Sequence, residues 1–135
     1  CIPCKVRSGT DAELCTAVPS TGLIDVDKRS KNPMVGKTLP LSHELFDFAE
    51  TIFDVLESRQ VILSKKGEDK GVRLSFEGFP YLIVWSKPEG DFVAVEPWGG
   101  LSTCSDEDDI LEHKRGCLVA KPGETVTRGF EIEIL

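Results

Sequence analysis

The stretch GFPYLIVWSKPEGDFVAVEPWGG, from Gly78 to Gly100, contains two apolar runs separated by a short polar segment. Tyr81 to Trp85 is apolar at every position, which is typical of a central strand covered on both faces. Lys87 to Gly90 has proline and glycine in positions suited to a turn. We therefore predict a second strand from Phe92 to Glu96, antiparallel to the first.

Strand signals continue on both sides of this stretch. Gln60 to Lys65 is a β-type run, and an alternating run from Val72 to Phe76 follows a charged turn, which together predict a hairpin. Further short strands are expected at Glu13 to Val18, Gly22 to Val26, Cys117 to Ala120 and Phe130 to Ile134. Ser42 is expected to cap a short helical turn within Leu39 to Phe46. Many short strands with almost no helix predict an all-β chain, an antiparallel β-sandwich that spans residues 1–135 as one domain.

Composition excludes several classes of partner and cofactor. The net charge of -7 argues against nucleic acid and anionic membranes, since both require basic surfaces. No apolar run is long enough to span a bilayer, and no signal peptide is visible. Five cysteines without a secretory signal indicate reduced thiols and a cytoplasmic location. The Cys1-Ile-Pro-Cys4 motif is interpreted as chance because no second such motif follows, and no metal site is expected.

Glu96 closes the predicted Phe92 strand and is followed directly by Pro97 and Trp98. On a strand, Phe92, Ala94 and Glu96 would share one face. A carboxylate at this position needs an explanation, because burying an unpaired charge is costly. Two interpretations remain open from the residues alone. Glu96 is either a sugar-binding and proton-transfer group beside a flat indole ring, or a structural glutamate paired with a cation.

Four separated motifs occur in a fixed order along the chain: Leu39-Pro-Leu-Ser-His-Glu-Leu-Phe46, Gly78 to Pro88, Val95-Glu-Pro-Trp98 and Lys121-Pro-Gly-Glu124. Together they resemble the aldose 1-epimerase (galactose mutarotase) family, in its bacterial branch with a Glu-Pro-Trp motif. The resemblance covers about Leu39 to Leu135. It implies an antiparallel β-supersandwich, of which this chain looks like the carboxy-terminal half, so that it is a partial domain.

The resemblance also implies an activity, the interconversion of the α and β anomers of a free aldose. In that family a glutamate acts as base on the anomeric hydroxyl and a histidine acts as acid on the ring oxygen. Glu96 matches the base, and Trp98, His43 and Lys87 are candidate contacts for a hexose. No cofactor is implied. Trp85 is expected in the core.

The family pattern is incomplete here, which leaves a second function open. The His-Pro motif that carries the family's acid is missing, and Glu50 or Asp47 stands near the place of a common aspartate. A non-catalytic carbohydrate-binding β domain is therefore the alternative to an isomerase. Half of a large sandwich would also expose unpaired strand edges, which favours a homodimer formed through those edges.

Overall fold

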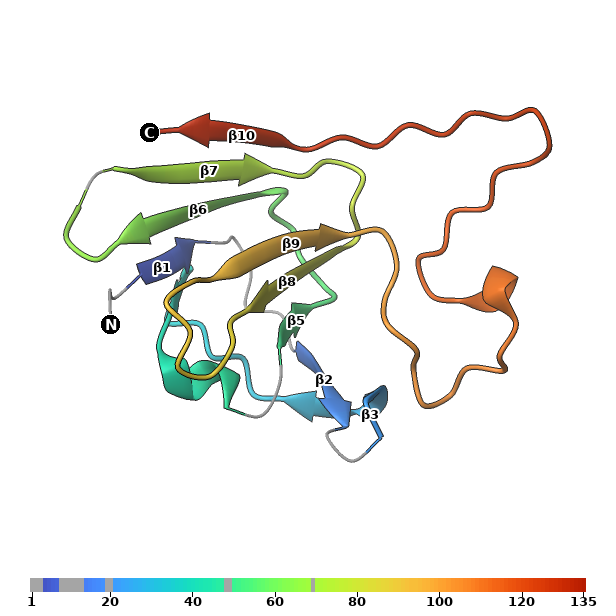
Figure 1. The fold of residues 1–135 in the computed structure, drawn as a ribbon, viewed down its shortest axis with the longest axis horizontal. Coiled ribbons are helices and arrows are strands. Elements are labelled where there is room, and N and C mark those ends of the chain that lie inside the picture. Colours follow the sequence, from blue (N-terminus) through green and yellow to red (C-terminus); the bar gives the residue numbers. More distant parts are fainter. Residues whose placement is uncertain (1–3, 8–13, 19–20, 48–49, 69) are drawn as a thin grey trace.

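Two antiparallel five-stranded sheets stack face to face in the computed structural model, which describes residues 4–7, 14–18, 21–47, 50–68 and 70–135 (Figure 1). The first sheet has the order β10-β7-β6-β1-β4 and consists of β1 (Cys4–Arg7), β4 (Thr38–Pro40), β6 (Gln60–Lys65), β7 (Gly71–Ser75) and β10 (Glu131–Ile134). The second has the order β3-β2-β5-β8-β9 and consists of β2 (Leu14–Val18), β3 (Leu23–Ser30), β5 (Thr51–Phe53), β8 (Tyr81–Trp85) and β9 (Ala94–Trp98).

Helix is limited to two short 3-10 turns in the described residues, η1 (His43–Phe46) and η2 (Leu111–His113). Every ladder between the named strands is antiparallel. The fold class predicted from the sequence, an antiparallel β-sandwich, is therefore confirmed. The predicted central strand is confirmed as well, since β8 lies between β5 and β9.

The core lies between the two sheets. Its buried members come from both layers and from the segments that join them: Leu39, Phe46, Phe53, Leu56, Val61, Leu74, Phe76, Leu82 and Val84. Because side chains alternate along a strand, Leu82 and Val84 of β8 point into this core while Ile83 points to the opposite face. There Ile83 belongs to a second, smaller cluster. Glu96 and Trp98 of β9 lie on that outer face with Ile83.

The strand β9 begins at Ala94, two residues later than predicted. The hydroxyl of Ser86 donates a hydrogen bond to the carbonyl of Phe92 at 2.7 Å. The Phe92 carbonyl therefore bonds to a side chain and not to a neighbouring strand. Phe92 is 51% exposed and its ring meets Trp85 edge-on, with centroids 5.6 Å apart. The predicted alternation holds from Ala94 onward, since Val93 and Val95 pack against the core.

Three further predictions differ from the structure. Residues 117–120, predicted as a strand, form none, because no described strand lies beside them. Ser42 precedes η1 but its side chain makes no capping hydrogen bond. The strand β3 continues to Ser30, beyond the predicted end at Val26. Glu13 and Cys1 lie outside the described residues.

Candidate functional site

Glu96 lines a small hollow on the outer face of the second sheet. The other lining residues are Glu50, Ile83, Trp85 and Trp98, and the cavity volume is about 160 Å³. Strand register explains this grouping. Ile83 of β8 stands opposite Glu96 of β9, and residues directly opposite in an antiparallel pair share a face. Trp98 lies two residues further along β9, so its side chain is on the same face.

Trp98 holds the carboxylate of Glu96. The indole Nε1 donates a hydrogen bond to Oε2 of Glu96 at 2.9 Å. Glu96 forms no ion pair with the cations that the structure describes, and its Oε1 has no hydrogen-bond partner among those residues. The carboxylate is therefore oriented by one neutral donor and keeps an oxygen for another group. Trp98, predicted as a stacking ring, acts here through its N–H.

Two groups in the hollow were not assigned to it by the sequence. Trp85 was expected in the core, but it is 37% exposed and lines the hollow beside Glu96. Strand alternation could have placed Trp85 at the hollow, because Trp85 is two residues from Ile83 and shares its face. Glu50 contributes a second carboxylate from just before β5. The arrangement thus combines two carboxylates with two indole rings above an apolar floor.

The loop that follows β9 covers the outer face next to the hollow. Leu101 and Cys104 pack with Ile83 and the partly buried ring of Trp98. The loop backbone is fixed to β3, because Ile24 donates to the carbonyl of Thr103 at 3.0 Å and accepts from the amide of Ser105 at 2.9 Å. Burial of the Cys104 thiol raises its pKa, as expected of a structural cysteine.

Ion pairs close this loop on itself. The Arg115 guanidinium binds both carboxylate oxygens of Asp106, at 2.6 and 2.5 Å, and this contact holds the pKa of Asp106 below its ordinary value. The hydrogen bond from Lys114 lowers the pKa of Glu107, and the one with His113 lowers the pKa of Asp108. The acidic run is thus tied to the basic residues that follow it. His113 is exposed, as expected.

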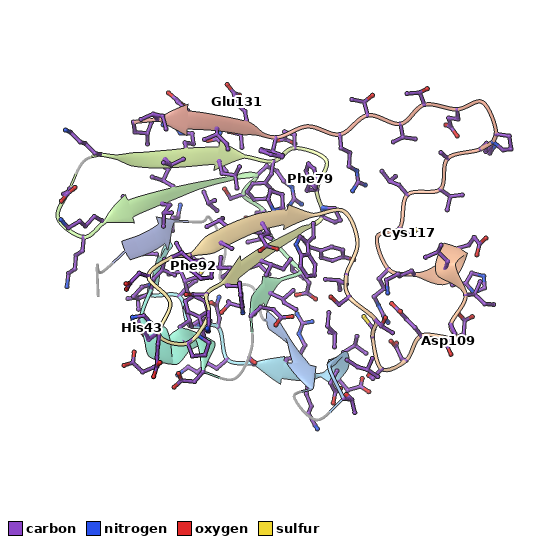
Figure 2. The ribbon with its side chains drawn as sticks, viewed as in Figure 1. His43, Phe79, Phe92, Asp109, Cys117 and Glu131 are labelled. Carbon is purple, nitrogen blue, oxygen red and sulfur yellow. The ribbon has the colours of Figure 1, made fainter. Side chains whose placement is uncertain are left out.

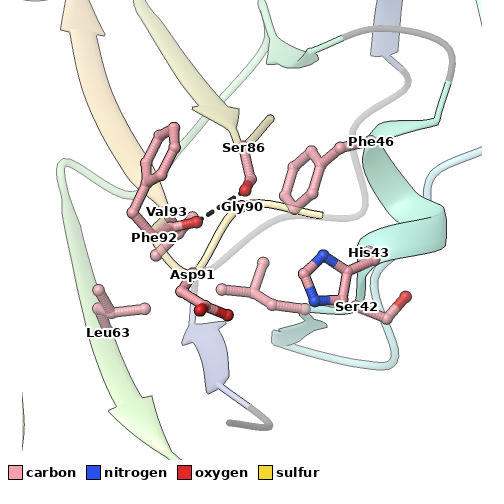
Figure 3. A pocket seen from close by; sticks show the side chains of 10 residues that line it. Ser42, His43, Phe46, Leu63, Ser86, Gly90, Asp91, Phe92 and Val93 are labelled. Atoms are coloured by element: carbon pink, nitrogen blue, oxygen red, sulfur yellow. Dashed lines mark hydrogen bonds between the residues drawn. The ribbon is translucent and has the colours of Figure 1, made fainter. Parts of the chain in front are cut away.

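His43 lies in a different pocket. Together with Leu41, Ser42, Phe46, Leu63, Ser86, Gly90, Asp91, Phe92 and Val93, it lines a cavity of about 650 Å³ between η1, β6 and the β8–β9 turn (Figure 3). This pocket and the Glu96 hollow share no residue among those that the structure describes. The two labelled residues His43 and Phe92 lie together at one end of the sandwich in Figure 2. The structure thus does not bring His43 to Glu96.

Lys87 lies in the β8–β9 turn and is exposed. It lines neither the Glu96 hollow nor the His43 pocket. Its backbone shapes the turn, because the carbonyl of Lys87 accepts from the amide of Gly90 at 2.8 Å. Of the four residues predicted for the site, the structure therefore places Glu96 and Trp98 together and His43 and Lys87 elsewhere.

The described ranges contain neither a membrane-spanning helix nor a cluster of metal-binding side chains. Neither of the two 3-10 turns there has the length and apolar character that a membrane-spanning helix requires. No group of three or more histidine, cysteine, aspartate or glutamate side chains in those ranges is arranged to hold a metal ion.

The chain is similar in sequence to two curated proteins of Lactococcus lactis subsp. lactis. It is 37% identical over 130 residues to the plasmid and chromosomal forms of protein LacX. The aligned segment covers 93% of this chain and 44% of each LacX protein. The chain thus spans less than half the length of the curated relatives that it matches. No protein-family model matches it.

Solved structures show which fold this is. A galactose mutarotase-like protein from Lactobacillus casei ATCC 334 superposes with a TM-score of 0.83 at 24% identity, over 99% of this chain and 47% of its own. A galactose mutarotase related enzyme from Lactobacillus acidophilus gives 0.81 at 25% identity, over 98% of this chain and 45% of its own. The chain has the galactose mutarotase-like fold, as the sequence resemblance implied, and it corresponds to somewhat less than half of those structures.

Proposed function

We propose that this chain belongs to the aldose 1-epimerase family and represents its Glu-Pro-Trp branch and carboxy-terminal half. In this proposal the Glu96 hollow binds a free aldose and Glu96 is the base in anomer interconversion. The observation that supports it most is the carboxylate of Glu96, which is oriented by Trp98 and is not neutralised by any described cation. A cytoplasmic location is part of the proposal, on the grounds of the free thiols that the composition indicates.

The chemistry requires a base at one position and an acid at another. Glu96 takes the proton from the anomeric hydroxyl while the bond between C1 and the ring oxygen breaks and C1 becomes a carbonyl. The ring oxygen receives a proton at the same time. Rotation about C1–C2 and reclosure then give the other anomer. Glu50 is placed to accept a hydrogen bond from another sugar hydroxyl, and the exposed ring of Trp85 to stack on a C–H face.

The hollow supplies one wall of such a site. Its volume of about 160 Å³ is below the roughly 300–1,000 Å³ typical of pockets that enclose a ligand. The described residues that line it include no histidine. The acid for the ring oxygen must therefore come from outside this set of residues.

Polarimetry of a freshly dissolved aldose tests the proposal. A protein that contains this chain should accelerate mutarotation, and Glu96→Gln should reduce that acceleration about 10²–10⁴-fold, the usual contribution of a general base. Glu50→Gln is the matched control, since it removes a neighbouring carboxylate and should weaken binding without abolishing catalysis. An unchanged rate in Glu96→Gln would show that Glu96 is not the base.

A non-catalytic carbohydrate-binding domain is the second candidate. It is favoured by the lack of a histidine among the described residues that line the Glu96 hollow. It predicts that hexose binds at Glu96, Trp85 and Trp98 and that mutarotation is not accelerated, even when the whole protein is present. The ligand in either case is a small hexose. Measuring binding and rate on one sample separates the two functions.

A further inference from the structure

The loop that follows β9 comes back after η2 and packs against the end of the strand from which it started (Figure 1). Residues 114–117 form a tight turn there, in which the amide of Cys117 donates to the carbonyl of Lys114 at 3.0 Å. Gly116 adopts the left-handed region in this turn, with a φ of 71°. We call residues 114–117 the return turn.

The return turn packs on the backbone that leaves β9 and on the neighbouring strand β8. The amide of Leu101 donates to the carbonyl of Arg115 at 3.4 Å. A Cβ added at Gly116 would lie 2.7 Å from the ring of Tyr81 and 2.9 Å from the carbonyl oxygen of Gly99. Cβ atoms do not approach other atoms so closely, and the positive φ also favours glycine. The contact with Tyr81 therefore requires glycine at this position.

Tyr81 connects this packing to the candidate site. It stands directly opposite Trp98 in the β8–β9 ladder, so the two side chains share the outer face of the sheet. Both side chains pack against the smaller buried cluster that contains Ile83. The indole N–H of Trp98 in turn donates to the carboxylate of Glu96. Packed groups thus connect Gly116, through Tyr81 and Trp98, to that carboxylate.

Ion pairs tie the return turn to the first part of the loop. They follow one another in antiparallel order along the chain: Asp106 with Arg115, Glu107 with Lys114 and Asp108 with His113. Exposed ion pairs are individually weak, but a guanidinium bound through both carboxylate oxygens is a well-defined contact. The backbone of residues 103–105, just before the acidic run, is bonded to β3. The ion pairs therefore connect the return turn to the second sheet.

We propose that Gly116 and Arg115 are positioning residues for Glu96, an inference that rests on the proposed function of Glu96 as the base. The return turn packs on Tyr81 and so fixes the indole of Trp98, which holds the carboxylate toward the hollow. A general base must lie within hydrogen-bonding distance of the proton that it takes. Loosening the return turn therefore lowers kcat and leaves KM nearly unchanged.

Gly116→Ala tests the inference in a protein that contains this chain. The added methyl group must displace the Tyr81 ring, so kcat for mutarotation should fall about tenfold while KM changes less than about twofold. The indole N–H of Trp98 should exchange with water about tenfold faster. Gly67→Ala is the matched control and should change neither quantity. Gly67 also has a positive φ, of 84°, but an added Cβ there meets nothing within 4 Å.

Arg115→Ala is a second test that leaves Gly116 in place. It should change kcat and the indole exchange in the same direction as Gly116→Ala. Arg115→Lys should restore part of the loss, because lysine keeps the charge but not the paired hydrogen bonds of the guanidinium. Arg73→Ala removes the ion pair with Glu133 on the first sheet, and it should change neither quantity.

The two readouts separate this inference from the proposed function. If the unmodified protein does not accelerate mutarotation, the proposed function fails, and the indole exchange decides whether the return turn positions Trp98. If Gly116→Ala does not fold, the Arg115 variants decide the result. Folded Gly116→Ala and Arg115→Ala variants with unchanged indole exchange and unchanged kcat would overturn the inference. Equal losses in the Gly67→Ala control would overturn it as well, because they would show general destabilisation.

Discussion

Trp98 and Glu96 lie two residues apart on one face of β9, and the indole Nε1 of Trp98 donates to Oε2 of Glu96 at 2.9 Å. Pro97 between them contributes no backbone N–H. This contact fixes where the carboxylate points. A hydrogen bond to a charged acceptor is worth about 1.5–3 kcal/mol, enough to select one side-chain conformation over others.

We predict that Trp98→Phe, which keeps an aromatic ring but removes the donor, lowers kcat for mutarotation about 10-fold or more with little change in KM. The ring still fills its place beside Leu101 and Cys104, so the fold should be retained. Steady-state polarimetry measures both constants. A rise in KM of the same size, about 10-fold, at constant kcat would mean that Trp98 contacts the sugar and does not position Glu96.

Trp85→Ala should instead weaken hexose binding. Its ring is exposed at the hollow and supported edge-on by Phe92, so its loss removes a stacking surface. We expect the Kd to rise about three- to tenfold, which corresponds to about 0.5–1.5 kcal/mol of aromatic contact. Isothermal titration with the hexose provides the value. Phe130→Ala, which removes an exposed ring just before β10, should leave the Kd unchanged.

The fold itself depends on the core between the sheets. Phe76 is fully buried there, so Phe76→Ala should reduce the free energy of unfolding by about 3–5 kcal/mol. Val55→Ala, at a 58% exposed position, should change it by about 0.5 kcal/mol or less. Urea denaturation followed by circular dichroism compares the two. Similar midpoints for both variants would contradict the assigned packing.

Acid should loosen the loop after β9 before it affects the sheets. The pKa values of Asp106, Glu107 and Asp108 are lowered by Arg115, Lys114 and His113 respectively. The ordinary pKa is 3.8 for aspartate and 4.5 for glutamate. A carboxyl group whose pKa is lowered in the folded state stabilises that state fully at pH values above its ordinary pKa. The stabilisation is lost as the pH falls through the lowered pKa of the folded state.

Hydrogen-exchange protection of residues 101–116 should therefore be constant from neutral pH to about 5 and should fall below about 4. Protection of β8 serves as the internal control and should hold over the same range. Loop protection that stays level down to pH 3 would show that the three ion pairs do not hold the loop.

The sequence was sufficient for the elements whose periodicity is strong. The alternation around Leu74 and the uniformly apolar run from Tyr81 to Trp85 correctly predicted β7 and β8. Burial of one face of a strand produces an alternating pattern, and burial of both faces produces a continuous apolar run. Glu96 and Trp98 could be placed together for the same reason, since residues i and i+2 of a strand share a face.

Features that depend on distant neighbours could not be predicted in this way. Residues 117–120 have strand-like residues but no described strand beside them, and a strand exists only where a partner supplies hydrogen bonds. The Ser86 hydroxyl donates a hydrogen bond to the Phe92 carbonyl across a turn, so β9 begins later than predicted. His43 was grouped with Glu96 by motif order, yet order along the chain does not fix distance in space, and the structure places the two in separate pockets.

The central claim is that a sugar binds where Glu96 and the two tryptophans meet, and a titration of the ¹⁵N-labelled protein with free hexose tests it most directly. The chain has two tryptophans, so the two indole N–H resonances report on Trp85 and Trp98 without ambiguity. We predict that both resonances move with one saturable Kd and that Glu96→Gln weakens the response. Two indole resonances that stay fixed at saturating hexose would contradict the account.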